Sequence, residues 1–423
     1  MKRWIKNQGE LATTENRKLA LAIIEAGLSA IDTEEVISRF VKPEGDLLTI
    51  MGESFDLSKF KKIKVVGFGK ASARAALALE KILGPKIETG AVVGLAKISL
   101  DYIDVFAGSH PRPSMMNVEA GEKIYEILKN GSEDDLIIVL VSGGGSALLC
   151  YSKEECEQNM ALYDEFLKCG GTIEEINTVR KHLSILKGGG LAKVAYPANV
   201  VGLIFSDIPG DHFADVASGP TYKDESTVAD AAEIIRKYNL GKFDLIETPK
   251  EDKYFEKVRN FVLVSNKTAI SAMAEKSEEL GLKANILSTD MYDEIDSAVG
   301  KIFKAEAPDT TVLAAGEPEI KVARKGGKGG RNLHMALRVI KKGMIGEDSV
   351  FVSLASDGMD NSDAAGAIAD KKTIEKIKNQ GIDIDDHLER FDSYPVFQKS
   401  GDIIMTGATG ANVSDLMILL KKK

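Results

Sequence analysis

Short, continuous apolar runs alternate with amphipathic stretches along this chain, and the alternation restricts the possible folds more than any other feature. Runs such as Leu136–Val141 and Val200–Phe205 are followed by segments with helical periodicity. A strand that is apolar on both faces is buried on both faces, which is typical of a parallel sheet covered by helices. The runs are far too short to cross a bilayer, so we expect no membrane span.

One charged stretch, Gly241–Lys257, interrupts the alternation, and we expect it to link two domains. A second series of strands and helices begins at Phe261–Val264. A chain of 423 residues is long enough for two or three domains. We therefore expect two α/β domains, residues 1–245 and residues 246–423. The apolar tail Asp415–Leu420 fits a strand, although its periodicity also allows a helix.

The composition excludes several classes of protein. The net charge of −9 disfavours a general nucleic-acid binder, because a phosphate-binding surface needs a basic footprint. The 3 cysteines form no CxxC pair, and an odd number favours reduced thiols over a disulfide framework. The basic N-terminus is not followed by the apolar segment of a secretory signal. We expect a cytoplasmic protein, monomeric or homodimeric, that binds neither nucleic acid nor membranes.

Many of the 39 glycines gather in loops that follow predicted strands, which is where α/β sheets bind ligands. The first such loop contains Gly67, Gly69 and Lys70. Its glycines permit close backbone approach, and the helix that follows favours an anion at its N-terminus. A lysine is disfavoured there by the helix dipole unless an anion is bound. The loop lacks Walker A spacing, and Ser72 replaces the third glycine of a dinucleotide fingerprint, so a structural turn is the alternative.

The second loop contains three consecutive glycines between two serines: Ser142, Gly143, Gly144, Gly145 and Ser146. Such a run is poor for stability, since glycine loses the most backbone entropy on folding. It is well suited to a nest of N–H donors around phosphate or carboxylate oxygens. A flexible turn is the alternative, and the residues do not match a G-x-S-x-G nucleophile elbow.

Charged residues accompany two further segments. Arg180 and Lys187 lie seven positions apart, so on a helix they share a face, and Arg180 can offer two hydrogen bonds to a carboxylate or phosphate. A solvated basic helix face explains the same pattern. Asp207 follows a strongly apolar strand, where a catalytic or metal-binding carboxylate would lie, although an Asx turn is a serious alternative.

The segment Lys321–Arg331 is the most distinctive in the chain, because five basic residues and four glycines fall within eleven positions. It precedes an amphipathic helix expected over Leu333–Ile340. A merely solvated loop would not need so many glycines. We therefore expect a polyanionic ligand held by a mobile basic lid and a helix N-terminus, with Lys328, Arg331 and Asn332 nearby.

An acidic segment follows the strand expected over Ser349–Leu354. Asp357 and Asp363 belong to it, and they fit Mg²⁺ ligation or nucleotide contact. The glutamate that closes an EF-hand loop is missing, so a calcium site of that kind is excluded. Another small-residue loop, Thr406–Asn412, is able to approach a ligand closely.

Nine segments, taken in order, resemble the sequence blocks of the glycerate 2-kinase family, often called the MOFRL family. The resemblance extends from about Asn16 to Leu420. Its blocks are GFGKAS from Gly67, SHPRP from Ser109, SGGGSALL from Ser142, INTVRKHLSILKGG from Ile176, SDIPGD from Ser206, ASGPT from Ala217, GGKGGRN from Gly326, SDGMDNSDAAGA from Ser356 and TGATGANVSDL from Thr406. The chain departs from the family at Gly190, often basic there, and at Ser114, where an HPxPD block would have aspartate.

The resemblance implies ATP- and Mg²⁺-dependent phosphorylation of D-glycerate at its 2-hydroxyl, giving 2-phosphoglycerate. It further implies a Rossmann-like, three-layer N-terminal domain with a parallel sheet, a C-terminal domain with a mixed sheet, and an active site in the cleft between them. The family's catalytic lysine and arginine correspond to Lys70 and Arg331. We expect these two cations to neutralise the transferring γ-phosphoryl group from the two sides of the cleft.

The remaining candidates divide into two groups. Those expected to bind substrate or nucleotide are Gly67, Gly69, His110, Ser142, Gly143, Gly144, Gly145, Ser146, Arg180, Lys187, Lys328, Asn332 and Asp363. Those expected to hold Mg²⁺ are Asp207 and Asp357, with Glu317 behind them, and one of the aspartates could instead accept the 2-hydroxyl proton.

Two other functions compete with the kinase. The strand–GxG–helix pattern also fits a hydroxypyruvate or 2-hydroxy-acid reductase with a nicotinamide cofactor. Ser72 weakens that alternative, as does the lack of an acidic residue at the end of Ala91–Ala96. A non-catalytic nucleotide- or anion-binding regulator would bind ATP without turnover. Polar groups at so many strand ends exceed what simple binding needs.

Overall fold

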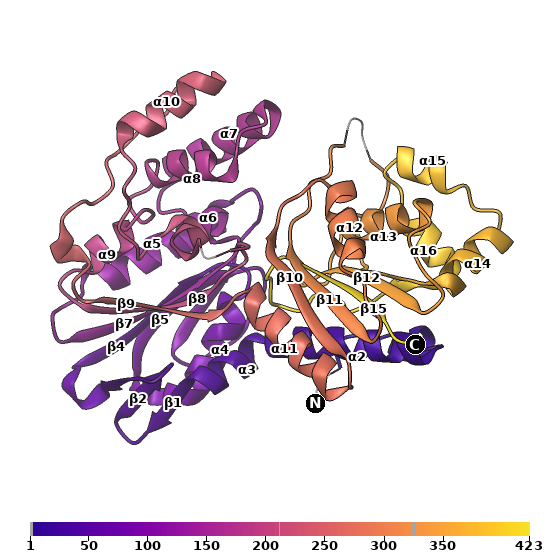
Figure 1. The fold of residues 1–423 in the computed structure, drawn as a ribbon. Helices are drawn as coiled ribbons and strands as arrows, with labels where there is room; N and C mark the ends of the chain where they lie inside the picture. The colour runs from indigo at the N-terminus through magenta and orange to yellow at the C-terminus, as the bar shows by residue number, and fades with distance from the viewer. Residues whose placement is uncertain (1–2, 211, 323–325) are drawn as a thin grey trace. The chain divides into compact units, whose positions relative to one another are not determined.

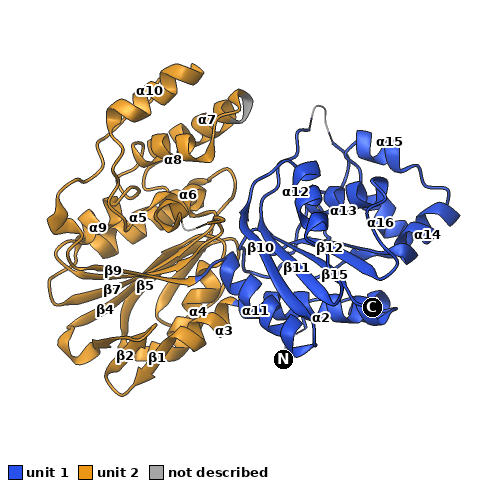
Figure 2. Cartoon of the chain, in the orientation of Figure 1, with its two compact units in different colours: residues 1–32, 264–423 blue, residues 33–263 orange. Residues whose placement is uncertain are grey.

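The structure is a computed structural model that describes residues 3–210, 212–322 and 326–423. It comprises two compact units, residues 33–263 and residues 1–32 with 264–423 (Figure 2). Each unit has a central six-stranded sheet and helices, which confirms the expected pair of α/β domains. Among the described residues, no helix combines the length and the apolar character that crossing a membrane requires.

The units divide the chain differently from the expected boundary between residues 245 and 246. The N-terminal helix α2 (Glu15–Ala30) packs against α11 (Asn266–Glu279), so it belongs with the C-terminal half. A buried ion-pair network holds it there, because Arg17 pairs with Asp370 at 2.6 Å and with Asp402 at 2.7 Å. Neither contact is apparent from local sequence patterns.

The charged stretch expected to be a linker instead packs onto the unit 33–263. The Ile246 N–H donates to the His182 carbonyl at 2.8 Å, and the Thr248 hydroxyl donates to Asp224 at 3.0 Å. The stretch leads into β9 (Val258–Val264), which is an outer strand of the same sheet. The unit 33–263 therefore ends at Leu263, within this strand.

The sheet of unit 33–263 has the strand order β6-β5-β4-β7-β8-β9. Numbered from β4, this is the order 3-2-1-4-5-6 of the Rossmann fold, and ligands bind where that order reverses, between β4 and β7. All pairings from β6 to β8 are parallel, as the continuous apolar runs predicted. The strands are β4 (Lys62–Phe68), β5 (Ile87–Gly94), β6 (Ile103–Ala107), β7 (Asp135–Ser142), β8 (Asn199–Phe205) and β9.

Helices cover both faces of this sheet, with α5 and α9 on one face and α4 on the other (Figure 1). Alternate strand residues such as Val66 and Val139 pack in one core with Ile124 of α5 and Leu191 of α9. The helices are α3 (Thr33–Phe40), α4 (Ser72–Leu83), α5 (Met115–Lys129), α6 (Gly145–Leu148), α7 (Lys153–Cys169), α8 (Ile173–Lys181), α9 (Gly190–Ala195) and α10 (Val228–Tyr238). A small antiparallel sheet lies between α3 and β4 in the chain, formed by β1 (Val41–Glu44), β2 (Leu47–Ile50) and β3 (Glu53–Asp56).

The unit of residues 1–32 and 264–423 has a mixed sheet, as expected. Its strand order is β10-β11-β15-β12-β13-β14. β10 and β11 are parallel, whereas the C-terminal strand β15 pairs antiparallel with both β11 and β12. The apolar tail is therefore a strand. The strands are β10 (Lys283–Met291), β11 (Thr310–Gly316), β12 (Ser349–Ala355), β13 (Gly366–Ala369), β14 (Ile403–Ile404) and β15 (Asp415–Lys421).

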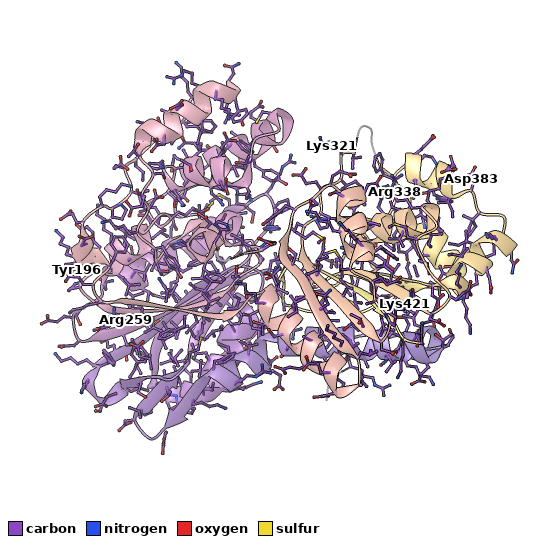
Figure 3. The ribbon with its side chains drawn as sticks, viewed as in Figure 1. Tyr196, Arg259, Lys321, Arg338, Asp383 and Lys421 are labelled. Atoms are coloured by element: carbon purple, nitrogen blue, oxygen red, sulfur yellow. The ribbon has the colours of Figure 1, made fainter. Side chains whose placement is uncertain are left out.

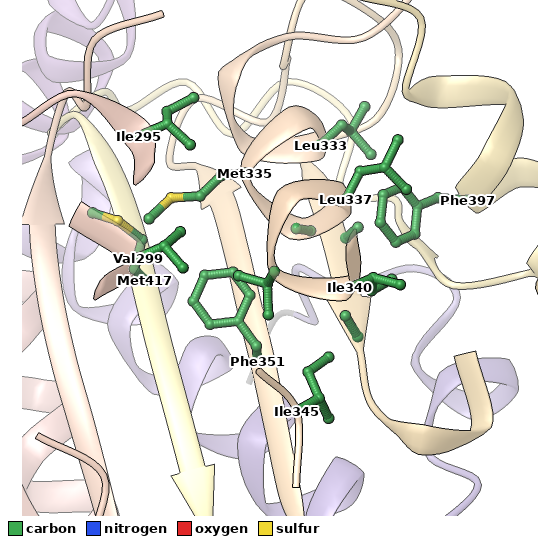
Figure 4. Packing of buried hydrophobic residues seen from close by; sticks show 14 of the residues in the cluster. Ile295, Val299, Leu333, Met335, Leu337, Ile340, Ile345, Phe351, Phe397 and Met417 are labelled. Carbon is green, nitrogen blue, oxygen red and sulfur yellow. The ribbon is translucent and has the colours of Figure 1, made fainter. Parts of the chain in front are cut away.

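The core of this unit lies between the sheet and α13 (Arg331–Lys341), which presents Leu333, Leu337 and Ile340 to neighbouring apolar side chains such as Phe397 (Figure 4). This burial fixes the helix that follows the basic, glycine-rich segment. The other helices are α1 (Gln8–Leu11), α2, α11, α12 (Ile295–Lys304), α14 (Lys371–Asn379), α15 (Ile384–Glu389) and α16 (Tyr394–Ser400).

Candidate active site

The carboxyl ends of β4, β7 and β8 bring three of the predicted loops together in the unit 33–263. Phe68 pairs with Val141 and Ser142 pairs with Phe205, so the loops that follow these strands begin side by side. The Lys70 N–H donates to the Gly143 carbonyl at 2.8 Å. The predicted glycine loops therefore form one structure at the point where the strand order reverses.

Glycines permit this close approach of the loops. Gly69 has a φ of 114°, and a Cβ there would overlap the backbone and side chain of Ser142. A Cβ on Gly143 would overlap the carboxylate of Asp207, which places Asp207 against this loop. Gly67 lies inside β4 instead, where a Cβ would press on Leu140. Gly67 thus serves strand packing and lies outside the loop in which we expected it.

Two basic side chains, those of His110 and Lys70, lie against Gly144. A Cβ on this residue would lie 3.1 Å from Nε2 of His110 and 3.2 Å from Cγ of Lys70. Burial, together with the positive charges of Lys70 and Arg180, lowers the pKa of His110 to about 4. His110 is therefore neutral at pH 7, and Lys70 and Arg180 both lie close enough to act on it.

Arg180 is a cation without a counter-ion among the described residues. It lies in the last turn of α8, and no described side chain or carbonyl accepts a hydrogen bond from its guanidinium or forms an ion pair with it. Burial lowers its pKa to about 10. Holding an unpaired charge away from water is costly, so this position indicates a site for an anion that the protein itself does not supply.

The two serines that flank the glycine run bond to the protein. The Ser142 hydroxyl accepts the Ala71 N–H at 3.0 Å, and the Ser146 hydroxyl lies 2.9 Å from that of Ser218. Gly145 begins the short helix α6, where a Cβ would press on Ala217. The serines and Gly145 therefore shape the loop, and the backbone at 143–144 remains next to the cations.

Lys187 contradicts the prediction that it shares a helix face with Arg180. Helix α8 ends at Lys181, and the chain turns before it reaches Lys187. The Lys187 side chain is fully buried and pairs with Glu155 at 2.8 Å. A buried lysine has to find a carboxylate partner, and here that partner comes from α7.

A second group of predicted residues lies in the other unit, at the end of β11. Residue Gly316 of β11 and residue Ala355 of β12 both pair with Asp415, the first residue of β15. Arg331 Nε lies 3.1 Å from Asp415 Oδ2, and an Arg331 terminal nitrogen lies 3.4 Å from Glu317 Oε2. Two carboxylates thus orient Arg331, and its pKa is raised by them against the effect of burial.

Asp415 is buried, and burial changes the pKa of its carboxyl group strongly. Its pKa is raised to about 7, mainly by burial and also by Glu317 and Asp360, although Arg331 and Asn332 act in the opposite direction. The Asn332 amide donates to Asp415 Oδ1 at 2.8 Å, but no described residue donates a hydrogen bond to Oδ2. Asn332 is itself buried, so it positions Asp415 within the protein.

The N-terminus of α13 is already occupied by a carboxylate. Asp360 accepts the N–H groups of Gly330 at 3.1 Å, Asn332 at 3.1 Å and Leu333 at 2.8 Å. These are the donors that a bound anion would need. Asp360 thus already occupies these donors, and the expected polyanion at this helix N-terminus stays a prediction that would require other donors or the displacement of Asp360.

The rest of the basic segment is only partly within the described residues, since 323–325 lie outside them. Lys328 pairs with Asp363 at 2.7 Å, with both side chains exposed, and its ammonium lies 3.6 Å from the ring centroid of Tyr394. Lys328 and Asp363 thus interact with each other on the surface.

The three carboxylates predicted to hold Mg²⁺ are in different settings. Asp207 belongs to the unit 33–263, whereas Asp357 and Glu317 belong to the other unit. Asp357 Oδ1 accepts the Met359 N–H at 3.0 Å, and Glu317 pairs with Arg331. Within the described part of the chain, no three of His, Cys, Asp and Glu gather into a metal cage. A protein that binds Mg²⁺ through substrate phosphates needs only one or two carboxylates, and these residues fit that pattern.

Two residues of this group were absent from the sequence-based candidates, Asp360 and Asp415. Both lie in segments already singled out, SDGMDNSDAAGA and TGATGANVSDL. Asp415 opens an apolar strand, and a carboxylate at such a position is buried and needs a cationic partner. That pattern would have marked Asp415 as a candidate, without identifying Arg331 as its partner.

Comparisons with known proteins agree over nearly the whole chain. Residues 19–249 match a domain of unknown function, DUF4147, and residues 310–415 match the MOFRL family. A protein named glycerate 2-kinase from Pyrococcus horikoshii is 34% identical over 96% of this chain and 97% of its own length. A crystal structure of glycerate kinase from Thermotoga maritima superposes with a TM-score of 0.83 and 31% identity, covering 96% of this chain and 99% of that one.

A protein of Agrobacterium vitis bears a provisional name of a different kind, hydroxypyruvate reductase. It is 36% identical over 84% of this chain and 86% of its own length.

Proposed function

Because the chain belongs to the glycerate 2-kinase family, we propose that it transfers the γ-phosphoryl group of ATP to the 2-hydroxyl of D-glycerate, giving 2-phosphoglycerate and ADP. The single observation that supports this best is the anion site of the unit 33–263. There Arg180 lacks a counter-ion among the described residues and lies, with Lys70, close to His110. Both substrates of the proposed reaction are anions.

The first group of residues, Lys70, Arg180 and the backbone at Gly143 and Gly144, binds and orients an anion in this mechanism. A phosphate oxygen or the glycerate carboxylate would replace the missing counter-ion of Arg180. Neutral His110 adds no further charge to be compensated. Phosphoryl transfer requires mainly positioning and charge neutralisation, which such a site supplies.

The second group supplies Arg331 in a fixed orientation. Asp415 and Glu317 hold its guanidinium. The positive charge is therefore already oriented before a phosphoryl group binds. We propose that Arg331 and Lys70 are the two cations that neutralise the transferring group. Removing a key arginine in phosphoryl transfer lowers the rate by about 10³–10⁵.

The carboxylates that would hold Mg²⁺ in this mechanism are Asp207 and Asp357. A Mg²⁺ ion held by these residues would supply positive charge that neutralises the phosphate groups. Glu317 is engaged by Arg331, which favours an orienting role for it. We take Asp207, which lies against Gly143, as the alternative candidate to accept the hydroxyl proton.

The decisive experiment combines ATP, D-glycerate and the enzyme, and identifies the product by phosphorus NMR. We expect 2-phosphoglycerate. If 3-phosphoglycerate formed, or no phosphorylated product at all, the proposal would be wrong. An NADH absorbance assay with hydroxypyruvate tests the reductase alternative, which we expect to give no turnover. In the structure β5 ends at Gly94 and no acidic residue follows it directly, so a ribose hydroxyl would lack its usual partner.

A further inference from the structure

A pocket of about 210 Å³ lies next to Arg331 in the unit that contains α13. Arg331 forms part of its lining, together with the glycines of the segment 326–330, Ile320, Val322, His334 and Phe391. Figure 3 labels Lys321, which stands between Ile320 and Val322 in the sequence, and Arg338, which lies further along α13. None of the roles assigned above uses this pocket.

The described walls of the pocket are uncharged except at Arg331. Ile320 and Val322 are aliphatic, and the ring of His334 stacks on that of Phe391, with centroids 5.5 Å apart and planes 21° apart. Burial lowers the pKa of His334 to about 4, so the ring is neutral at pH 7. Such walls favour an uncharged, flat ligand over a small anion, which would lose its hydration there.

One polar atom in this wall lacks a partner. His334 Nδ1 is buried, and no described residue forms a hydrogen bond with it. A buried nitrogen without a hydrogen-bond partner costs free energy, so a polar group of a bound ligand would be favourable at this position. A nitrogen heterocycle offers both a flat apolar face and hydrogen-bonding edges.

The size of the pocket limits what it accepts. Pockets for whole drug-sized ligands usually measure roughly 300–1,000 Å³, and this one is smaller. It suits a single ring system, with the remainder of the ligand outside. Since Arg331 is part of the lining, the group attached to that ring system would meet a cation that we have assigned to the phosphoryl group.

We propose that this pocket binds the adenine base of ATP, with the triphosphate leading from the pocket to Arg331. The inference rests on the proposed function, because it takes ATP as the phosphoryl donor. It goes further in assigning the base to a pocket and in making His334 and Gly326 determinants of nucleotide affinity.

Gly326 offers a way to fill the pocket with little harm to the fold. Its φ is not positive, and a Cβ there would lie 3.3 Å from Cβ of Phe391, so a side chain fits with a small adjustment. We therefore choose Gly326→Val. Gly300→Val is the matched control, because Gly300 lies in α12 of the same unit and a Cβ there has nothing within 4 Å.

The test measures binding of adenosine to the full-length wild type and to both variants by isothermal titration calorimetry, which needs no turnover. We expect Gly326→Val to weaken adenosine binding at least about tenfold, since the valine side chain would compete with the base for the pocket. Gly300→Val should bind as the wild type does. Inhibition by inorganic triphosphate and the KM for D-glycerate should be the same in all three proteins, and thermal unfolding verifies that each is folded.

Three results would overturn the inference: no adenosine binding to the wild type, equal adenosine affinity in wild type and Gly326→Val, or a raised KM for D-glycerate with unchanged adenosine affinity. The last would make the pocket an acceptor site. A failure of the proposed function is distinguishable, since it would appear as a missing 2-phosphoglycerate signal while adenosine binding still followed the pattern expected here.

Discussion

Arg331 and Asp415 form an ion pair in which Nε lies 3.1 Å from a carboxylate oxygen that accepts no hydrogen bond from any described residue. Asp415 is buried, and its pKa is raised to about 7, mainly by that burial. A protonated Asp415 no longer attracts the guanidinium. The orientation of Arg331 therefore depends on pH close to neutrality.

We expect kcat of the wild type to fall as the pH decreases from about 8 to about 6, because protonation of Asp415 removes the charge of one of the two carboxylates that orient Arg331. Asp415→Asn should show a low kcat at every pH and should lose this acidic limb of the profile. A pH–rate profile of both proteins tests the prediction, and an unchanged limb in the variant would assign it to another group.

Stability provides the control for that variant. The pKa of Asp415 is higher in the folded state than its ordinary value of 3.8, so the folded state binds the extra proton between these two values. The contribution of this group to stability is then greatest at low pH and decreases as the pH rises through about 7. Asp415→Asn cannot ionise, so we expect it to be no less stable than the wild type at pH 8. Urea unfolding at that pH measures this.

Arg180→Met should lower activity without lowering stability. The guanidinium has no counter-ion among the described residues, and burial lowers its pKa to about 10, so its removal relieves an unfavourable charge. The loss of a charge-assisted contact to substrate should reduce kcat/KM by about 10- to 100-fold. Kinetics and thermal unfolding are measured together, with Arg236→Met as the control, because Arg236 is exposed on α10 of the same unit. A large drop in Tm for Arg180→Met would indicate a structural role instead.

Lys187→Met should have the opposite effects. The ion pair with Glu155 is buried, with side-chain exposures of 0% and 5%. Removing one partner leaves an unpaired buried charge, which costs about 3–5 kcal/mol of unfolding free energy. We expect the double variant Lys187→Met/Glu155→Gln to recover part of that loss, and the KM values of folded protein to remain unchanged. A raised KM with normal stability would restore the sequence-based assignment of Lys187 to ligand binding.

The sheets could be predicted from the sequence because they depend on local patterns. Continuous apolar runs indicated parallel strands, and the structure has them from β6 to β8. The division into units was not predictable in this way. It depends on Arg17, which meets its carboxylate partners Asp370 and Asp402 more than three hundred positions later in the chain.

The candidate site was partly predictable for the same reason. The loops after β4, β7 and β8 adjoin because parallel strands align their carboxyl ends, and this was expected. The partners of individual charges were not. Nothing near Lys187 in the sequence identifies Glu155, and nothing near Arg331 identifies Asp415, because a buried charge selects its partner in three dimensions.

Two neighbouring aspartates, Asp360 and Asp363, have different roles near the N-terminus of α13. Asp360 is buried and accepts three backbone N–H groups, whereas Asp363 is exposed and pairs with Lys328. Asp360→Ala should lower the unfolding free energy by at least about 2 kcal/mol, because it leaves buried donors without an acceptor. Asp363→Ala should change it by less than about 0.5 kcal/mol, as surface ion pairs contribute little.

Urea denaturation of the two variants measures both values under one set of conditions. Asp360→Asn should retain part of the unfolding free energy that Asp360→Ala loses, because its amide oxygen still accepts a hydrogen bond from the helix N-terminus. If both alanine variants were equally stable, the cap would be satisfied by water, and the N-terminus of α13 would again be open to an anionic ligand. If Asp360→Ala alone is destabilised, the N–H groups at the N-terminus of α13 are used to bind Asp360. An anionic ligand at this end of the helix would then bind through the guanidinium of Arg331.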